Sequence, residues 1–315
     1  MLLLVTNRND LTADWLIIEL ERRGTPYLRF NTEDYPSAVR LRWQEDGRAA
    51  LRIAGVDHPL GRFAAVWYRR PVPPTVASED QAVADWASRE AKDALDAVWR
   101  THDALWVNHP EKNLRAGSKP EQLLVARRLG FEVPASLVTN DLGEATAFAR
   151  RHRRLVCKAL VDGLVETVNG PDRLLWTSEV AEGDLADLSD FGPEPYFFQE
   201  LVPKSCDVRV TVIGDDVFGV RIASQNQAAT RLDWRRGPTA ELAHEVESLP
   251  RELAARCRTL VEHYGLLFGA IDLGRRPDGG YTFFELNPNG QWAWLEHRTG
   301  LPLRSRLADL LESAL

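Results

Sequence analysis

The sequence predicts a mixed α/β fold, and three observations lead to this prediction. Residues 2–5 and 27–30 are short apolar runs on either side of a helical pattern at 11–23, which is typical of a strand–helix–strand opening. A second long helical pattern covers residues 80–105. Near the end of the chain, two apolar runs flank Asp278-Gly279, which is a strong short-range signal for a hairpin.

Composition narrows the class of protein. The chain has 315 residues, of which 44% are hydrophobic and 27% charged, so it is long enough for two or three units with cores of their own. The first five residues are too few for a signal sequence, and no apolar run approaches ~18 residues, so we expect a cytoplasmic protein without a membrane segment. A net charge of −7 argues against nucleic acid as a partner. The three scattered cysteines predict neither a disulfide framework nor a zinc site.

The first hundred residues contain no catalytic pattern. The helix at 11–23 is expected to turn Trp15 and Ile18 inward, and the helix at 80–105 to bury Val83, Trp86, Leu95 and Val98. Between them, residues 39–43 and 49–53 form a predicted hairpin, and 64–68 a core strand. Arg69 and the arginine after it end that strand, where they could either meet an anionic substrate or lie in solvent.

Two lysines stand out in the next stretch. Residues 108–119 form a predicted linker, and Pro120 opens a helix that ends at Gly130. Lys119 lies at the start of this helix, and Lys158 lies inside an apolar strand at 155–159. Most lysines lie in solvent, but a charged side chain within a buried strand needs a partner.

A third stretch places polar side chains on strands. The run 196–202 is apolar and ends in polar residues, and Lys204 precedes a strand at 207–213 whose alternation puts Asp207 and Arg209 on one face. The strand at 217–222 adds Arg221, and a polar connection carries Asp233 and Arg235, which fit surface charge as well as substrate contact. Helices are predicted at 240–264, 292–297 and 303–314.

The hairpin itself predicts a metal site. If Asp278 and Gly279 are the two loop residues, paired positions sum to 557, so that Asp272 lies opposite Glu285 and Asn287 shares their face. Two opposed carboxylates repel one another and call for a cation, and hard oxygen ligands suit Mg²⁺. Solvated acids on an ordinary hairpin are the alternative, which leaves the Asn-Pro-Asn-Gly run after Glu285 without an explanation.

These residues carry a resemblance to a known superfamily. Asp272 followed by Glu285-Leu286-Asn287 resembles the metal-binding end of the ATP-grasp superfamily. The continuation Asn-Pro-Asn-Gly-Gln-Trp, with Trp294 and the Thr-Gly-Leu-Pro run that ends at Pro302, resembles more narrowly the ATP-grasp maturases of graspetides, the microviridin-type cyclic peptides.

The resemblance implies roles for the candidate residues. It implies Mg²⁺ at Asp272, Glu285 and Asn287, and transition-state charge at Arg209 and Arg221, with Asp233 and Arg235 beside the substrate. It implies a loop over the phosphates at residues 161–170. The implied ATP-binding residues are two phosphate lysines, an adenine hinge and two neighbours of that hinge: Lys119, Lys158, Gln199, Glu200, Leu201, Val202, Lys204 and Asp207.

The resemblance also implies an architecture and partners. The expected architecture is a Rossmann-like pre-ATP-grasp domain at 1–110, followed by two α+β subdomains that clasp ATP, a central one at 111–190 and a C-terminal one at 191–315. A ribosomal precursor peptide is the implied partner, and a homodimer the implied assembly.

The function implied is that of an ATP-dependent macrocyclase. It would activate Glu or Asp side chains of the precursor as acyl phosphates and join them to Ser or Thr hydroxyls or Lys amines. A ligase that adds a free amino acid to a carboxylate is the main alternative. An ATP-grasp kinase and a nucleotide-binding module without turnover are further ones.

Overall fold

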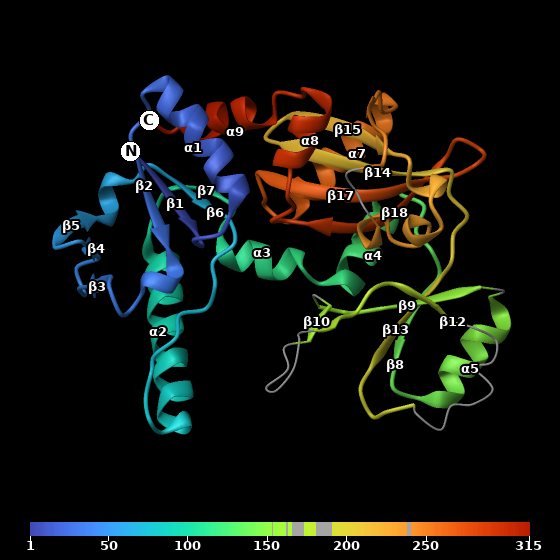
Figure 1. Ribbon diagram of the computed structural model, residues 1–315, viewed down its shortest axis with the longest axis horizontal. Helices are drawn as coiled ribbons and strands as arrows, with labels where there is room; N and C mark the ends of the chain where they lie inside the picture. The colour runs from blue at the N-terminus through green and yellow to red at the C-terminus, as the bar shows by residue number, and fades with distance from the viewer. Residues whose placement is uncertain (153, 162, 166–172, 181–190, 238–240) are drawn as a thin grey trace.

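The computed structural model describes residues 1–152, 154–161, 163–165, 173–180, 191–237 and 241–315. Their sheets fall into three regions (Figure 1). The first region holds a four-stranded parallel sheet and a small three-stranded sheet, the second a four-stranded antiparallel sheet, and the third a five-stranded antiparallel sheet. No helix of the described residues is long and apolar enough to cross a membrane.

The N-terminal region confirms the predicted strand–helix–strand opening. Asp10 caps helix α1 through two backbone N–H groups, and Gly24 ends it in the left-handed conformation, as this helix boundary requires. The parallel sheet has the order β2-β1-β6-β7, and the predicted hairpin is β3 and β4. The elements of this region are β1 (Leu2–Thr6), α1 (Leu11–Arg23), β2 (Tyr27–Asn31), β3 (Arg40–Trp43), β4 (Ala49–Ile53), β5 (Val56–Pro59), β6 (Ala65–Tyr68), α2 (Gln81–Thr101) and β7 (Leu105–Val107).

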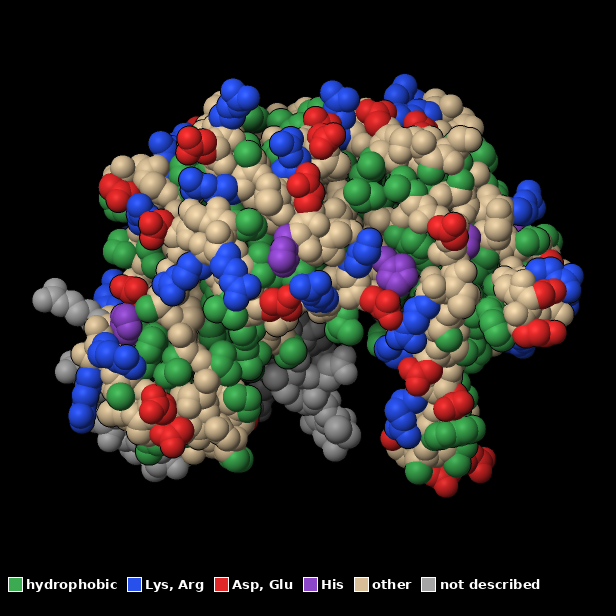
Figure 2. All heavy atoms as spheres, turned by 180° about the vertical axis from the view of Figure 1, so that it is seen from behind, with side chains coloured by type: hydrophobic (Ala, Val, Ile, Leu, Met, Phe, Trp, Pro, Cys, Tyr) green, Lys and Arg blue, Asp and Glu red, His purple; other side chains and the backbone are tan. Residues whose placement is uncertain are grey.

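The inner faces predicted for these two helices are partly wrong. On α1, Leu16 and Leu20 are buried whereas Ile18 is 55% exposed. On α2, Val83 and Trp86 are exposed because the N-terminal half of the helix projects beyond the sheet (Figures 1 and 2). Periodicity gave the right helices here, but the neighbouring elements determine which stripe is covered.

The central region is built on the antiparallel order β12-β9-β13-β8. Strand β13 pairs with β8 on one side and β9 on the other. The boundary predicted at residue 190 is therefore wrong, because β13 lies beyond it and still belongs to the central sheet. The elements are β8 (Ser136–Thr139), α5 (Leu142–Arg151), β9 (Leu155–Lys158), β10 (Leu164–Val165), β11 (Arg173–Leu174), β12 (Ser178–Val180) and β13 (Tyr196–Glu200).

The C-terminal region has the sheet order β16-β15-β14-β17-β18. The helix predicted at 240–264 begins only after Pro250, because residues 244–247 pair with β15 as strand β16; residue 240 lies outside the described residues. The elements are β14 (Cys206–Ile213), β15 (Asp216–Ile222), β16 (His244–Glu247), α7 (Arg251–His263), β17 (Phe268–Arg275), β18 (Tyr281–Asn287), α8 (Ala293–Thr299) and α9 (Leu303–Glu312). Short 3₁₀ helices occur at Thr32–Asp34, Leu60–Arg62, Ser224–Asn226, Ala228–Thr230 and Trp234–Arg236.

Two connections tie the regions together. The predicted linker contains helix α3 (Pro110–Ala116), and α4 (Lys119–Arg128) follows it. Ala116 and Leu123 from these helices lie in one core with Leu260 of α7 and Ile271 of β17, so this segment packs on the C-terminal sheet. At the other end, α9 packs against α1, which brings the last helix onto the first domain (Figure 1).

Candidate active site

One cavity of about 560 Å³ lies between the central and C-terminal regions. All but two of the predicted site residues line it, and they come from α4, β9, β13, β14, β17, β18 and the connections between them. The two exceptions are Arg209 and Arg221. The roles assigned to these residues remain predictions, but the fold brings most of them to one place.

Asp272 and Glu285 face each other across β17 and β18, as predicted. The turn differs from the prediction: Arg276 and Gly280 close a three-residue loop at 277–279, with Gly279 in the left-handed region at φ 87°. A three-residue loop alone would shift the pairing by one. Phe284 is an extra residue in β18 and forms a β-bulge, which restores the opposition of the two acids.

Arginines neutralise the two acids. One guanidinium nitrogen of Arg209 donates to both oxygens of Asp272 at 2.8 Å, and Arg235 lies 3.8 Å from Glu285. Burial raises the pKa of Asp272 to about 6, although Arg209 opposes this shift. The pKa of Glu285 is lowered despite its burial, because Arg235, Lys119 and Lys158 surround it. The acid pair therefore lies in a field of positive charge.

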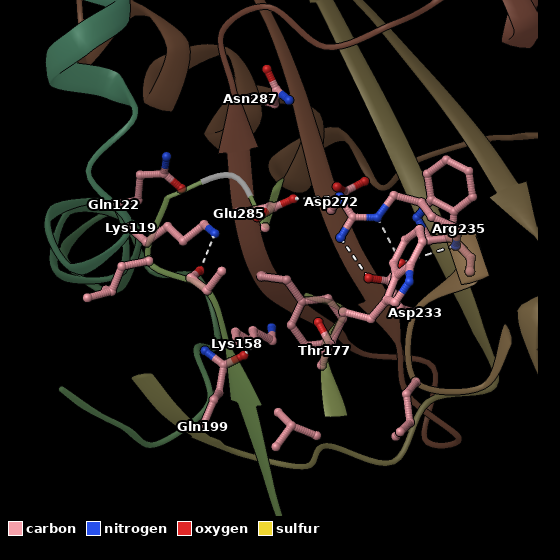
Figure 3. A pocket seen from close by; sticks show the side chains of 18 of the residues that line it. Lys119, Gln122, Lys158, Thr177, Gln199, Asp233, Arg235, Asp272, Glu285 and Asn287 are labelled. Carbon is pink, nitrogen blue, oxygen red and sulfur yellow. Dashed lines mark hydrogen bonds and ion pairs between the residues drawn. The ribbon is translucent and has the colours of Figure 1, made fainter. Parts of the chain in front are cut away.

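Asp233 lies in the polar connection between β15 and β16 and binds Arg235. Its carboxylate accepts from Arg235 at 2.7 and 2.8 Å (Figure 3). Burial acts to raise the pKa of Asp233, but these bonds outweigh it and keep the pKa below its usual value. The Asp233–Arg235 pair fixes the arginine that faces Glu285.

The structure does not bring Arg221 to the cavity, which argues against the transition-state role predicted for it. Arg221 pairs with Val208, and directly paired residues point to the same face of a sheet. Val208 lies in the core under α7, on the face opposite to Arg209. Arg221 forms an ion pair with Glu245 on the outer surface instead. Alternation along the sequence predicts which residues of one strand share a face. It does not predict which residues of two neighbouring strands pair.

The predicted phosphate lysines lie on the central side of the cavity (Figure 3). Lys119 donates to the backbone oxygens of Ala159 and Val161 at 2.6 and 3.2 Å. Lys158 donates to Gln199 Oε1 at 2.6 Å. Burial lowers the pKa of Lys158 to about 8. Of the loop predicted at 161–170, residues 162 and 166–170 lie outside the described residues.

Lys204 differs from Lys158 in its partner. Its ammonium lies 2.7 Å from the carboxylate of Asp207, and both side chains are buried. Burial raises the pKa of Asp207, although Lys204 opposes the shift. The predicted hinge begins with the last two residues of β13. Glu200 N–H and Leu201 N–H donate to the backbone oxygens of Ala135 and Arg154, which fixes the backbone beside Val202 at the cavity wall.

Asn287 lies apart from the two acids. It is exposed, its side-chain oxygen accepts from Asn289 N–H at 2.8 Å, and Figure 3 shows its amide turned away from Asp272 and Glu285. The following loop is tightly packed, since a Cβ on Gly290 would lie 2.2 Å from that of Ala270. Its backbone oxygen at Asn289 accepts from Arg69.

Several residues outside the predicted set also contribute to the site. Arg69 is only 1% exposed and connects the N-terminal parallel sheet to the loop after β18. Asn108 and Gln122 each bond to the hairpin backbone with both ends of the amide. Phe284 lies in the cavity wall. The sequence drew attention to Arg69 at the end of its strand. It gave no sign of Asn108 or Gln122, because an amide that will be buried looks like any other polar residue in a sequence.

The donor set fits a hard divalent cation in part. Among the described residues there is no cluster of three His, Cys, Asp or Glu side chains. Asp272 and Glu285 supply two half-buried carboxylates on one face, and Asn287 is two residues from Glu285 along the same strand. A cation with few protein ligands, completed by substrate phosphates, is the usual arrangement for Mg²⁺.

Comparison with solved structures places this arrangement among known proteins. An ATP-grasp ligase associated with a ribosomally synthesised, modified peptide (RiPP) from Chryseobacterium gregarium, in complex with ADP and a leader and core peptide, is 28% identical over 100% of this chain and 97% of its own, with a TM-score of 0.91. The macrocyclase MdnC from Microcystis aeruginosa MRC, bound with precursor peptide MdnA, is 27% identical over 100% of both chains, with a TM-score of 0.88. The macrocyclase MdnB from the same source is 27% identical over 98% of both, with a TM-score of 0.82.

Over its whole length the chain is similar to ATP-grasp ligases, and the fold, the site and these likenesses identify it as an ATP-dependent ligase. Residues 1–113 match the family model of the MvdD pre-ATP grasp domain. The predicted resemblance to the ATP-grasp maturases of ribosomal peptides is thereby confirmed. A search of the curated proteins gives no match.

Proposed function

We propose that the protein is an ATP- and Mg²⁺-dependent macrocyclase of a ribosomally made precursor peptide. The observation that carries the proposal is the single cavity lined by Lys119 and Lys158 on one side and by Asp272 and Glu285 on the other. The likeness to ligases solved with ADP, with Mg, and with leader, core or precursor peptides supports it. The same likeness favours a peptide over a free amino acid as the acceptor.

The reaction needs positioning and charge neutralisation rather than a side-chain nucleophile. A Glu or Asp carboxylate of the precursor attacks the γ-phosphorus of ATP, which releases ADP and leaves an acyl phosphate. A Ser or Thr hydroxyl, or a Lys amine, of the same peptide then attacks the acyl carbon, loses its proton and expels phosphate. The result is an ω-ester or ω-amide ring, and the peptide loses one water per ring.

The residues divide this work between them. Lys119 and Lys158 neutralise the phosphates, and the hinge at residues 199–202 holds adenine. Asp272 and Glu285 would hold Mg²⁺, and Asn287 would join them once its amide, here turned away, rotates toward the two acids; when bound, the metal neutralises triphosphate charge. Arg209 stabilises the acyl phosphate as it forms, because its guanidinium already lies at the acid pair.

The proposal extends to the state in which the protein works. We infer that the protein works in the cytoplasm, since ATP and newly made peptide occur in that compartment. We also infer that it works as a homodimer. The projecting half of α2 supports self-association, because Val83 and Trp86 are 48% and 57% exposed and lie one helical turn apart. Trp86→Glu should shift the mass measured by light scattering from dimer to monomer.

Mass spectrometry of a candidate precursor tests the function directly. Incubation with ATP and Mg²⁺ should lower the peptide mass by whole waters, with one phosphate released per ring. Tandem fragmentation should be suppressed between the joined residues. A gain of one amino acid residue would instead indicate a ligase that uses free amino acids, and a gain of phosphate alone would indicate a kinase.

A further inference from the structure

We propose that Gln199 and Phe284 are positioning residues that hold the ammonium of Lys158 between neutral groups, so that its charge is left for the nucleotide. The inference rests on the proposed function, because it presumes that Lys158 meets phosphate. It concerns how the protein prepares this lysine before ATP arrives.

The contacts of Lys158 are uncharged. Its Nζ donates to the amide oxygen of Gln199 at 2.6 Å and lies 5.2 Å from the centroid of the Phe284 ring. Within the described part of the chain, Lys158 has no carboxylate inside ion-pair distance. Lys204 also lies over the Phe284 ring, at 5.5 Å, but its charge is already paired with Asp207 at 2.7 Å. The Phe284 ring thus contacts two lysines, of which Lys204 is paired with a carboxylate and Lys158 is not.

Both neutral contacts are fixed by the surrounding structure. Gln199 is 1% exposed and its amide nitrogen donates to Ser136 Oγ at 3.1 Å, which orients the oxygen toward Lys158. Phe284 is the extra residue of the β18 bulge. Its ring occupies the space over Gly274, where a Cβ would lie 2.7 Å from the ring. Neither contact can relax easily toward another partner.

The physical reason for neutral contacts is the cost and value of a buried charge. A lysine removed from water needs contacts to stay ionised, and an amide oxygen and an aromatic face both provide them. A carboxylate would provide stronger contact, but it would cancel the charge that attracts phosphate. The amide and the ring therefore orient the ammonium without neutralising it.

Gln199→Glu provides the test because it keeps the size of the side chain and adds the missing charge. The carboxylate would accept from Lys158, and the Ser136 hydroxyl can rotate to donate to it. We expect the dissociation constant for Mg·ADP, measured by calorimetry, to rise about tenfold or more as the new charge neutralises Lys158. The melting temperature should not fall.

Gln199→Met is the matched control, since it removes the hydrogen bond without adding charge. If Gln199 only supported the fold, Gln199→Met would be the more harmful change and Gln199→Glu nearly silent. The proposal predicts the opposite order for nucleotide affinity. Phe284→Leu should weaken Mg·ADP binding. Phe284→Tyr keeps an aromatic face and should retain most of the wild-type affinity.

Lys158→Ala separates failure of this inference from failure of the proposed function. If Lys158→Ala weakens Mg·ADP binding but Gln199→Glu does not, the inference is overturned and the function stands. If wild type binds no Mg·ADP, or if Lys158→Ala binds as wild type does, the proposed nucleotide site itself is wrong.

Discussion

Asp272 lies opposite Glu285 because the bulge at Phe284 compensates for a three-residue turn. The acid pair and the aromatic contact of Lys158 thus depend on the same irregularity in β18. A bulge next to a site commonly redirects a side chain in this way. Here it places a carboxylate and a phenyl ring, from consecutive residues, along one cavity.

Glu285→Gln should abolish turnover and leave the fold intact. The change keeps the shape of the side chain but removes the negative charge that a divalent cation requires. Phosphate release with peptide, ATP and Mg²⁺ measures turnover, and circular dichroism checks the fold. An active Glu285→Gln enzyme at low Mg²⁺ would remove Glu285 from the metal site.

Lys158→Ala should weaken nucleotide binding more than Lys204→Ala. Lys204 already pairs with Asp207, so less of its charge is available to phosphate. Calorimetry with a non-hydrolysable ATP analogue and Mg²⁺ measures both variants. Equal effects would mean that Lys158 has no special role at the phosphates.

Nucleotide affinity should fall as the pH rises through about 8. Burial lowers the pKa of Lys158 to about 8, with Lys204 and Lys119 acting in the same direction and Glu285 and Asp233 opposing. Above that pH the free protein carries a neutral Lys158, which binds phosphate less well. Bound phosphate favours the charged form and raises the pKa of Lys158 in the complex, so the decline in affinity should begin near pH 8 and level off at the higher pKa of the complex.

Lys158→Arg is the control for this pH dependence. A guanidinium stays charged throughout the accessible range, so the variant should lose the decline even if its affinity is lower. The measurement is the dissociation constant for Mg·ADP between pH 6.5 and 9.5. A wild-type profile that stays flat to pH 9.5 would contradict the prediction.

Gly290→Ala should reduce both stability and activity. A Cβ there would lie 2.2 Å from Ala270 and 2.7 Å from a guanidinium nitrogen of Arg209, so the loop after β18 would have to move. We expect a loss of about 1–3 kcal/mol in the free energy of unfolding, as for other overpacked sites. Gly61→Ala, which has open space around its Cβ, should have little effect on either quantity.

Glu19→Gln should destabilise the contact between α1 and α9 by about 1–3 kcal/mol at neutral pH. Glu19 accepts from Arg22 and Arg23, and Arg23 also reaches Asp309 and Glu312 of α9. Hydrogen bonds from Arg22, and then from Arg23, lower the pKa of Glu19 to about 2 although burial opposes them. Thermal unfolding of both proteins measures the difference.

The lowered pKa of Glu19 determines how its contribution to stability changes with pH. Because the folded-state pKa lies below the ordinary value of 4.5, the contribution of Glu19 is complete above about 4.5 and is lost as the pH falls toward about 2. The difference in stability between wild type and Glu19→Gln should therefore narrow from pH 7 to pH 3. Glu252→Gln should show little difference from wild type at any pH, because the Glu252 side chain is 88% exposed beside Arg256.

The sequence by itself determined the local features of this protein. Periodicity predicted α1 with its bounds of Leu11–Arg23. Alternation predicted the faces within β14, and the Asp-Gly turn with its two apolar strands predicted the hairpin of β17 and β18. These features depend on neighbours along the chain, for which residue type and spacing are sufficient information.

Only the tertiary structure decided what depends on distant contacts. Register between β14 and β15 put Arg221 on the far face, although its spacing resembled that of a site residue. Strand β13 joined the central sheet across the predicted boundary. Phe284 and Gln199 met Lys158 because a bulge and a strand pairing brought them together. Such contacts join residues far apart in the chain, and no local pattern specifies them.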